Sequence, residues 1–284
     1  MIDAKVLDSG RMIKWCPGCG NFGTFRALKD AIVSLGLRQD QVVLVAGIGC
    51  SGTITNYIKV NTFHTLHGRV LPVSMGIKLV NPRLTVIGSA GDGDAYAIGV
   101  AHLIHAARKN IDITYIVHNN KVYGLTTGQA SPTSDFGQVT RSTPIGALEE
   151  PVNPLALALS SGATFVARGF AGDVKHLTKL IIEGIKHKGF ALIDVLQPCV
   201  VWDRVHSYSW YRERVYDLNE EGHDTSDIVA AFRKSFEWGD RIPIGIFYKV
   251  DKPTYEERLP QLKKIPIEED LKAIKIKDLI EELI

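Results

Sequence analysis

Short runs of apolar residues alternate along the chain with longer segments in which every third or fourth residue is apolar. Runs of strand length, rich in β-branched residues, lie at residues 42–46, 84–89, 111–118, 164–168 and 190–196. Helical spacing is found at residues 21–36, 95–108 and 174–188. Largely apolar strands that alternate with helices predict an α/β fold, with a mostly parallel sheet flanked by helices.

The carboxyl ends of parallel strands lie at one edge of the sheet, and ligands bind at this edge in folds of this class. The predicted strands lead into loops that begin after Ala46, Ser89, His118 and Leu196. These loops are rich in glycine and contain cysteine, Asp and Asn residues in close succession. The sequence therefore predicts one functional site, built by loops that are distant along the chain.

The composition is that of an ordinary soluble protein, and it argues against some partners. The 33 Lys and Arg residues nearly balance the 31 Asp and Glu residues, which gives no reason to expect a nucleic acid or an anionic membrane as partner. The longest membrane-like run, residues 95–107, is too short to span a bilayer and contains two histidines. No apolar stretch follows Met1, so we expect no signal peptide and a cytoplasmic protein.

The first candidate for chemistry is the run Gly91-Asp92-Gly93-Asp94, which follows one predicted strand, together with Asn119-Asn120 at the end of the next. Mg2+ takes about six oxygen ligands near 2.1 Å and usually shares them with phosphate groups. Asp92, Asn120 and the loop carbonyl of Val122 can supply half of that shell, and diphosphate oxygens and a water can complete it. Glycines and the start of the following helix let phosphate approach backbone N–H groups. Alone, Gly-Asp-Gly is also compatible with an ordinary turn.

Two motifs together resemble a known family. Gly91-Asp92-Gly93, followed one helix and one strand later by Asn119-Asn120, resembles the signature of proteins that bind thiamine diphosphate. The run from His118 to Gln129, with Cys16-Pro17-Gly18-Cys19-Gly20, resembles the β subunit of the 2-oxoacid:ferredoxin oxidoreductases. The resemblance covers residues 15–202. It implies thiamine diphosphate, Mg2+ and one 4Fe-4S cluster as cofactors, and coenzyme A as co-substrate.

Carried over by position, the resemblance assigns Asp92, Asn120 and Val122 to the metal ion. It favours His67 over His64 as a contact to the diphosphate. The residues that it expects to line the cofactor are Ile48, Gly49, Cys50, Ser51, His67, Gly93, Asp94, Gly124 and Leu125. No side chain of this chain is assigned as a general acid or base.

The chain has four cysteines, Cys16, Cys19, Cys50 and Cys199, which are too few for a disulfide scaffold. A cubane cluster takes four thiolates, in agreement with the resemblance. Zinc also takes four, but its structural sites usually contain two close pairs, and here Cys16 and Cys19 form a single close pair. Unrelated buried cysteines are the remaining alternative. Because Cys50 lies in the loop expected to touch the cofactor, we expect cluster and cofactor to be neighbours.

The resemblance implies oxidative decarboxylation of a 2-oxoacid with coenzyme A, giving acyl-CoA, CO2 and reduced ferredoxin. We expect activity only with an α subunit, because thiamine enzymes need a carboxylate at the aminopyrimidine ring that normally comes from a second domain. Two other interpretations stay open. The chain could be a thiamine enzyme without redox chemistry that carries a structural zinc, such as a synthase or decarboxylase. It could also be a non-catalytic, zinc-stabilised binding protein.

The loop at residues 124–129 follows the predicted metal site, and we expect it to approach the substrate. It contains no Lys or Arg. The second carboxylate of 2-oxoglutarate needs a cation when it is desolvated. We therefore expect pyruvate and 2-oxobutyrate to be preferred, with Lys121 and the α subunit as the open sources of a charge.

The C-terminal part carries less information. We expect residues 1–202 to form the cofactor-binding domain, and residues 203–284 to form an extension packed on the same domain and on a partner subunit. From Asp251 onward, 16 of the last 34 residues are charged. This tail fits a segment that wraps the surface or a solvated terminus, with a candidate helix from Glu268 onward.

Overall fold

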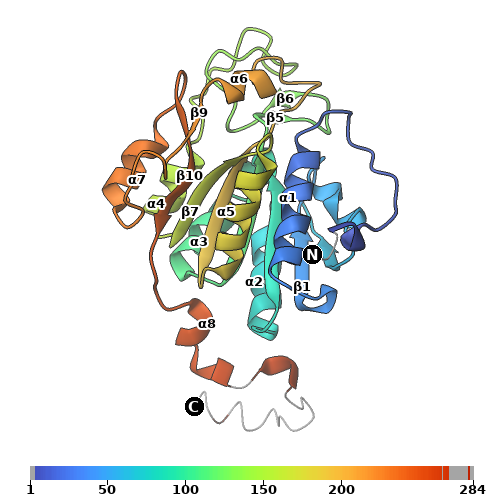
Figure 1. Cartoon of the computed structure of the whole chain (residues 1–284), viewed down its shortest axis with the longest axis vertical. Coiled ribbons are helices and arrows are strands. Elements are labelled where there is room, and N and C mark those ends of the chain that lie inside the picture. Colours follow the sequence, from blue (N-terminus) through green and yellow to red (C-terminus); the bar gives the residue numbers. More distant parts are fainter. Residues whose placement is uncertain (1–3, 264, 269–280, 282–284) are drawn as a thin grey trace.

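The computed structural model describes residues 4–263, 265–268 and 281 (Figure 1). The strands are β1 (Val42–Ala46), β2 (Asn61–His64), β3 (Thr85–Gly91), β4 (Ile113–Asn119), β5 (Val122–Tyr123), β6 (Gln129–Ala130), β7 (Phe165–Phe170), β8 (Phe190–Leu196), β9 (Val215–Asp217) and β10 (Ile242–Lys249). The α-helices are α1 (Asn21–Ser34), α2 (Val70–Val80), α3 (Val100–Lys109), α4 (Pro154–Ser160), α5 (Val174–Lys186), α6 (Tyr208–Arg212), α7 (Ile228–Ser235) and α8 (Tyr255–Arg258). Short 3-10 helices cover Ala4–Leu7, Gln39–Gln41, Gly52–Asn56, Pro260–Lys263 and Pro266–Glu268.

One eight-stranded sheet, in the order β2-β1-β3-β4-β8-β7-β10-β9, forms the centre of the protein. The neighbouring strands β2, β1, β3, β4, β8 and β7 all run parallel to one another. Strand β10 runs antiparallel to β7, and β9 runs parallel to β10. The prediction of an α/β fold with a mostly parallel sheet is confirmed. All five predicted strands are present, and β1 and β8 have the predicted bounds.

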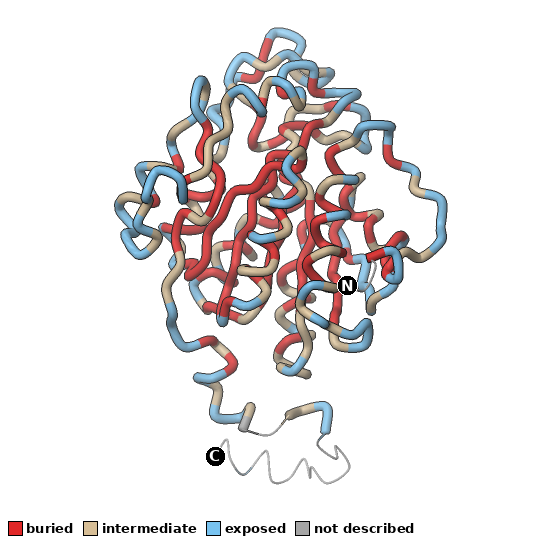
Figure 2. Tube along the Cα trace, in the orientation of Figure 1, coloured by how far each residue is buried: buried red, intermediate tan, exposed pale blue. Residues whose placement is uncertain are grey.

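The apolar runs form strands because both faces of the sheet are buried. In β1, Val43 and Val45 contribute to one core, and Val42, Leu44 and Ala46 contribute to the other. Helices α1 and α5 cover the second core, and α2, α3 and α4 cover the first. Buried chain is concentrated in the sheet in Figure 2.

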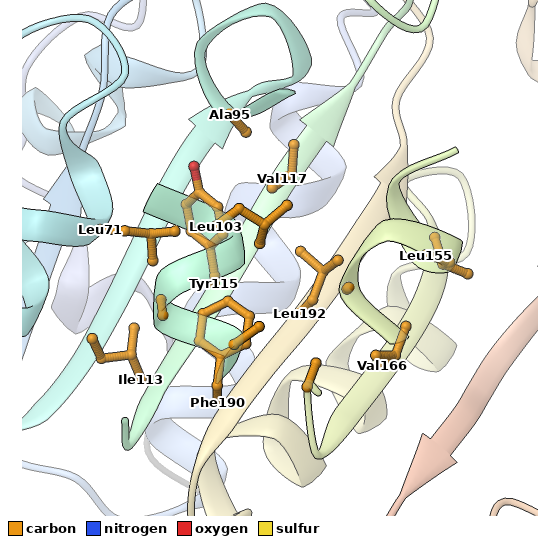
Figure 3. Packing of buried hydrophobic residues seen from close by; sticks show 14 of the residues in the cluster. Leu71, Ala95, Leu103, Ile113, Tyr115, Val117, Leu155, Val166, Phe190 and Leu192 are labelled. Carbon is orange, nitrogen blue, oxygen red and sulfur yellow. The ribbon is translucent and has the colours of Figure 1, made fainter. Parts of the chain in front are cut away.

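The first core is shown from close by in Figure 3. Leu71 of α2, Leu103 of α3 and Leu155 of α4 lie over the strands that carry Tyr115 and Phe190. Each large apolar side chain that leaves water in this way stabilises the fold by roughly 1.5–3 kcal/mol. The sheet is therefore a rigid platform for the loops at its carboxyl edge.

Side-chain caps fix where several helices begin. Asn153 accepts a hydrogen bond from the N–H of Ala156 at the start of α4, and Asp173 accepts one from His176 at the start of α5. The helix predicted at residues 95–108 is divided, which corrects the expectation. A π-helical turn, Asp94–Ile98, precedes α3, because the N–H of Gly99 bonds to the carbonyl of Asp94 at 3.0 Å.

Elements that the sequence did not predict complete the sheet. They include β2 at one edge, and β9 and β10 at the other edge, so residues beyond 202 extend the same sheet. Helix α2, which packs mainly on β3, was not predicted either. The start of the tail is fixed to the body, because the Asn110 amide donates to the carbonyls of Lys252 and Pro253. The helix expected from Glu268 onward lies outside the described residues. Within those residues, no helix combines the length and the apolar character needed to cross a membrane.

His118, at the end of β4, provides a test of the core. Its imidazole lies 3.1 Å from Ser89 Oγ and 2.9 Å from Asn21 Oδ1, and burial lowers the pKa of His118 from 6.5 to about 4. Because the pKa of His118 is lowered in the folded protein, the neutral imidazole contributes its full share to the free energy of unfolding above pH 6.5. This contribution is lost as the pH falls toward 4. Between pH 7 and 5, we expect the free energy of unfolding of the unmodified chain to fall about 2 kcal/mol more than that of His118→Gln. Urea unfolding measures both, and equal losses would contradict the assignment.

Candidate cofactor and cluster site

Loops from four strands meet at the carboxyl edge of the sheet, near the labels β5 and β6 in Figure 1. Backbone hydrogen bonds join them in series. The N–H of Gly47 bonds to the carbonyl of Ser89, and the N–H of Gln197 bonds to that of Asn119. The N–H of Gly20 bonds to the carbonyl of Pro198, which brings the N-terminal Cys-Pro-Gly-Cys loop to the same edge.

A single small cavity collects all the residues that the sequence assigned to the cofactor and its metal ion. Its lining includes Ile48, Gly49, Cys50, Ser51, His67, Asp92, Gly93, Asp94, Asn120, Val122, Gly124 and Leu125. The cavity measures about 70 Å³, whereas sites that enclose a small molecule measure roughly 300–1,000 Å³. The chain therefore encloses only part of a ligand of cofactor size at this position.

Asp92 lies at the base of this cavity and is 1% exposed. Its Oδ2 accepts hydrogen bonds from Ser131 Oγ at 2.5 Å and from Thr133 Oγ1 at 2.7 Å. Burial raises the pKa of Asp92, because desolvation disfavours the charged carboxylate. A divalent cation has the opposite effect, so this carboxylate fits a metal ion with oxygen ligands.

Asn120 and Val122 approach the same cavity from the end of β4. The N–H of Val122 donates to Asn120 Oδ1 at 3.1 Å, which folds the segment into a tight turn and fixes the amide. Val122 was expected to offer a loop carbonyl, but it lies in the short strand β5, which pairs with β6. The expectation that Val122 lies in a loop was therefore wrong, but Val122 does line the cavity, as expected.

Asp94 joins two of the loops that line the cavity. Its Oδ1 accepts the N–H of Ile48 at 3.1 Å and the N–H of Gly68 at 2.9 Å, and His67 Nδ1 lies 3.3 Å from the same oxygen. Burial raises the pKa of Asp94. Because a Cβ atom at Gly47 would lie 2.2 Å from Asp94 Oδ2, only glycine permits this approach. Asp94 thus holds the loops in place, and the half-buried imidazole of His67 lies beside it.

All four cysteines line a second cavity, of about 630 Å³. A Cβ atom at Gly124 would lie 3.8 Å from both Cys50 Sγ and Cys199 Sγ, so these sulfurs flank one glycine. Burial, followed by the neighbouring cysteines, raises the pKa of Cys19 to about 11. A metal ion beside such a thiol would favour its ionisation. Four thiols around one cavity fit a cluster that takes four thiolates.

The thiols surround a volume and do not meet at one point. In the part of the chain that the structure describes, no three His, Cys, Asp or Glu side chains form a group that could hold a metal ion. The sequence-based assignments of Cys16, Cys19, Cys50 and Cys199 to a cluster, and of Asp92 and Asn120 to Mg2+, remain predictions.

Several site residues were missed by the sequence analysis. Tyr123 lies over Gly93 and donates to its carbonyl at 3.2 Å, and Trp15 Nε1 donates to the carbonyl of Cys50 at 2.7 Å. Ser131 and Thr133, which bind Asp92, come from the segment after β6. The concentration of hydroxyl side chains at residues 131–134 is visible in the sequence, but nothing in their spacing indicates that they bind Asp92.

The charge around residues 124–129 also differs from expectation. Arg141 Nη1 donates to Thr127 Oγ1 at 2.5 Å, so a cation from another segment does reach this loop. Lys121 is buried, and its ammonium donates to the carbonyl of Thr133, so it is not the free charge left open by the sequence. The loop itself contains no Lys or Arg, as the sequence shows, and Arg141 is a neighbouring cation that the sequence analysis did not consider.

Known proteins share this architecture. The family model described as thiamine pyrophosphate enzyme, C-terminal TPP binding domain, matches residues 47–195. The model that describes the C terminal of the pyruvate ferredoxin oxidoreductase beta subunit matches residues 199–264. The fold and its carboxyl-edge site are thus those of a thiamine diphosphate-binding domain.

Individual relatives indicate which family within this class the chain belongs to. The 2-oxoacid:ferredoxin oxidoreductase subunit beta of Saccharolobus solfataricus is 52% identical over 260 residues, which cover 87% of this chain and 85% of that protein. Subunit beta of 2-oxoacid:ferredoxin oxidoreductase 1 from Aeropyrum pernix is 48% identical over 258 residues, covering 87% and 81%. The chain belongs to the family of 2-oxoacid:ferredoxin oxidoreductase β subunits.

A solved structure is similar over almost the whole chain. It is the 2-oxoglutarate:ferredoxin oxidoreductase from Magnetococcus marinus, with 2-oxoglutarate, coenzyme A and succinyl-CoA bound. The TM-score is 0.91 at 35% sequence identity, and the match covers 99% of this chain and 96% of that one.

The contact between Gly93 and Tyr123 can be tested by adding one methyl group. A Cβ atom at Gly93 would lie 2.2 Å from the Tyr123 ring, so we expect Gly93→Ala to lower the free energy of unfolding by roughly 1–3 kcal/mol. Gly76→Ala in α2 is the matched control, because a Cβ atom there would meet no heavy atom within 4 Å, and we expect stability to be equal or up to about 1 kcal/mol higher. Adding Tyr123→Leu should restore part of the loss in Gly93→Ala. Equal stability of the two alanine variants would contradict the close packing.

Proposed function

We propose that this chain is the cofactor-binding β subunit of an enzyme that oxidatively decarboxylates a 2-oxoacid with coenzyme A. The products are an acyl-CoA, CO2 and reduced ferredoxin, and the enzyme acts in the cytoplasm. The bound cofactors are thiamine diphosphate, Mg2+ and one 4Fe-4S cluster. Membership of the family supports this proposal, and the geometry of the carboxyl edge supports the redox part of it.

The observation that carries the redox chemistry is a wall shared by two cavities. Cys50, Asn120, Gly124 and Leu125 line both the small cavity at Asp92 and the large cavity at the cysteines. A thiamine enzyme without electron transfer has no need for thiols behind its cofactor. Cys50, Asn120, Gly124 and Leu125 would then separate the bound cofactor from the proposed cluster, which would accept its electrons.

Thiamine diphosphate, when bound, supplies a carbanion and an electron sink for decarboxylation. The task of this chain is to hold it. Asp92, Asn120 and the Val122 carbonyl would bind Mg2+, while His67 and the loop at residues 48–51 would face the diphosphate. Leu125 presents an apolar side chain at the wall between the two cavities, which limits the access of water.

An α subunit would complete the site. The cavity of about 70 Å³ accommodates only the metal and diphosphate end of the cofactor, and the exposed side chains of Ile48 and Leu125 border it. The aminopyrimidine and its carboxylate partner then lie on the α side of an interface. Cys16, Arg11 and Lys14 are exposed at the other cavity, where an acidic electron carrier such as ferredoxin can approach.

The non-redox alternative predicts zinc at the cysteines, and the binding-protein alternative predicts no thiamine diphosphate binding. Iron and acid-labile sulfide analysis of anaerobically purified α/β complex distinguishes the first, and cofactor titration distinguishes the second. We expect iron and sulfide in equal amounts and Mg2+-dependent binding. Zinc in place of iron would overturn the redox proposal.

Removing either side-chain metal ligand should abolish Mg2+-dependent thiamine diphosphate binding. For Asp92→Ala and Asn120→Ala, we expect affinity to fall by more than the roughly 10–100-fold that outer-shell changes cost. The fold should survive, because burial already disfavours the charged Asp92 carboxylate. Isothermal titration of the α/β complex measures the affinity, and circular dichroism checks the fold. Retained affinity in either variant would refute the metal site.

Each cysteine can be tested by its own substitution. We expect Cys16→Ser, Cys19→Ser, Cys50→Ser and Cys199→Ser each to lower the iron content and to block ferredoxin reduction. The reason is that all four thiols line the same cavity and a cubane cluster takes four thiolates. Iron analysis and the visible absorbance spectrum provide the measurement. Full iron content in any one variant would remove that residue from the ligand set.

Substrate choice can be read from kcat/KM of the α/β complex, since we expect no turnover by this chain alone. Leu125 and Thr126 line the cavity and are uncharged, so we propose that pyruvate and 2-oxobutyrate are preferred over 2-oxoglutarate. Arg141, held by Thr127, would support the remaining 2-oxoglutarate turnover. A charge-assisted hydrogen bond contributes about 1.5–3 kcal/mol, so Arg141→Gln should lower kcat/KM for 2-oxoglutarate about 10-fold or more. Pyruvate should be unaffected, and an unchanged ratio would exclude Arg141.

A further inference from the structure

Lys121 lies between the two residues proposed to hold Mg2+ at the end of β4, yet its side chain points away from them into the protein. It is 4% exposed, and its ammonium donates to the carbonyl of Thr133 at 2.6 Å and lies 2.7 Å from Asp135 Oδ1. The ammonium also lies 4.4 Å from the centre of the Trp238 ring. Its backbone has a φ of +60°, a left-handed conformation that is costly for a residue with a side chain.

The segment at residues 131–135, which binds this ammonium, also binds the other half of the proposed metal site. Ser131 and Thr133 both donate to Asp92 Oδ2. Ser134 Oγ donates back to the carbonyl of Lys121 at 2.6 Å. One segment therefore fixes Asp92 after β3 and the turn after β4, and Lys121 is bound to it through both its side chain and its backbone.

The far end of this arrangement is fixed as well. Asp135 Oδ2 lies 2.8 Å from His206 Nε2, and His206 Nδ1 lies 2.7 Å from Asp203 Oδ2. Burial opposes ionisation of Asp135, but contacts with His206 and Lys121 lower the pKa of Asp135 to about 2. The carboxylate that faces Lys121 is therefore ionised at neutral pH.

We propose that Lys121 is a positioning residue for the divalent metal ion: its buried ammonium holds residues 131–135 in the place from which Ser131 and Thr133 orient Asp92. This inference rests on the proposed function, since it assumes that Asp92 binds the metal ion. Lys121 itself does not touch the metal ion or the cofactor. Outer-shell partners of metal ligands typically change metal affinity about 10–100-fold when they are removed.

Lys78 offers a matched control elsewhere in the fold. It is 5% exposed, donates to the carbonyl of Leu84 at 3.0 Å and lies 2.8 Å from Asp112 Oδ2. Its partners are thus one carbonyl and one carboxylate, the same kinds that Lys121 contacts. Replacing either lysine removes one partner of a half-buried carboxylate: Asp135 keeps His206, and Asp112 keeps the contact to Lys188. Both substitutions should therefore lower stability, but only that of Lys121 should change the metal site.

The experiment is equilibrium dialysis of thiamine diphosphate against the complete α/β complex over a range of Mg2+ concentrations. We expect Lys121→Met to raise the Mg2+ concentration at half-saturation at least about 10-fold, and Lys78→Met to leave it within about two-fold of the unmodified complex. Lys121→Arg keeps a cation, so its Mg2+ concentration at half-saturation should stay within about three-fold of that of the unmodified complex. Melting temperatures, measured without Mg2+, should fall in both methionine variants.

A second variant keeps the test decisive if Lys121→Met does not fold. Ser134→Ala leaves the ammonium paired and removes the two hydrogen bonds of Ser134 Oγ, which donates to the Lys121 carbonyl and accepts from the N–H of Ser131. It should raise half-saturation about three-fold. Unchanged half-saturation in every folded variant at Lys121 and Ser134, with binding lost in Asp92→Ala, would overturn the positioning role alone. Mg2+-dependent binding retained in Asp92→Ala would overturn the proposed metal site itself.

Discussion

The burial of one carboxylate constrains the whole carboxyl edge of this sheet. Asp92 is 1% exposed, and a carboxylate in that position is stable only with hydrogen-bond donors and a cation around it. The chain supplies donors from a distant segment, through Ser131 and Thr133. That segment is in turn held by Lys121 and Asp135. This arrangement is the physical basis of the proposal that a divalent cation binds at Asp92.

Close approach of the loops is the second condition, and glycine makes it possible. A Cβ atom at Gly52 would lie 1.9 Å from the carbonyl oxygen of Gly47, so the loop after β1 can close only without side chains there. This closure places Cys50 beside Gly124, in the wall between the two cavities. The residues shared by the two cavities would separate the proposed cofactor site from the proposed cluster site, and this gives the redox proposal its physical basis.

The C-terminal part of the chain packs against the segments that hold this site. β9 and β10 extend the main sheet, and Trp238 and His206 contact the buried charges of Lys121 and Asp135. The domain division at residue 202 remains a prediction, and so does the contact of the extension with a partner subunit. If the proposed positioning role holds, substitutions far from the cavity would act on the proposed metal site.

The sequence by itself determined the five central strands β1, β3, β4, β7 and β8, the helices α1 and α5 and most of α3. It also determined the edge at which the site forms, because burial on both faces leaves a local apolar pattern and parallel strands end together. The residues that line the small cavity were named through the family resemblance that the motifs at Asp92 and Asn120 carry. Only the tertiary structure decided which side chains support them. The direction of Lys121 follows from a left-handed backbone, and Ser131 and Arg141 reach their partners across 39 and 14 residues of chain. Contacts of this kind leave no periodic signal, because they depend on where separate loops meet in space.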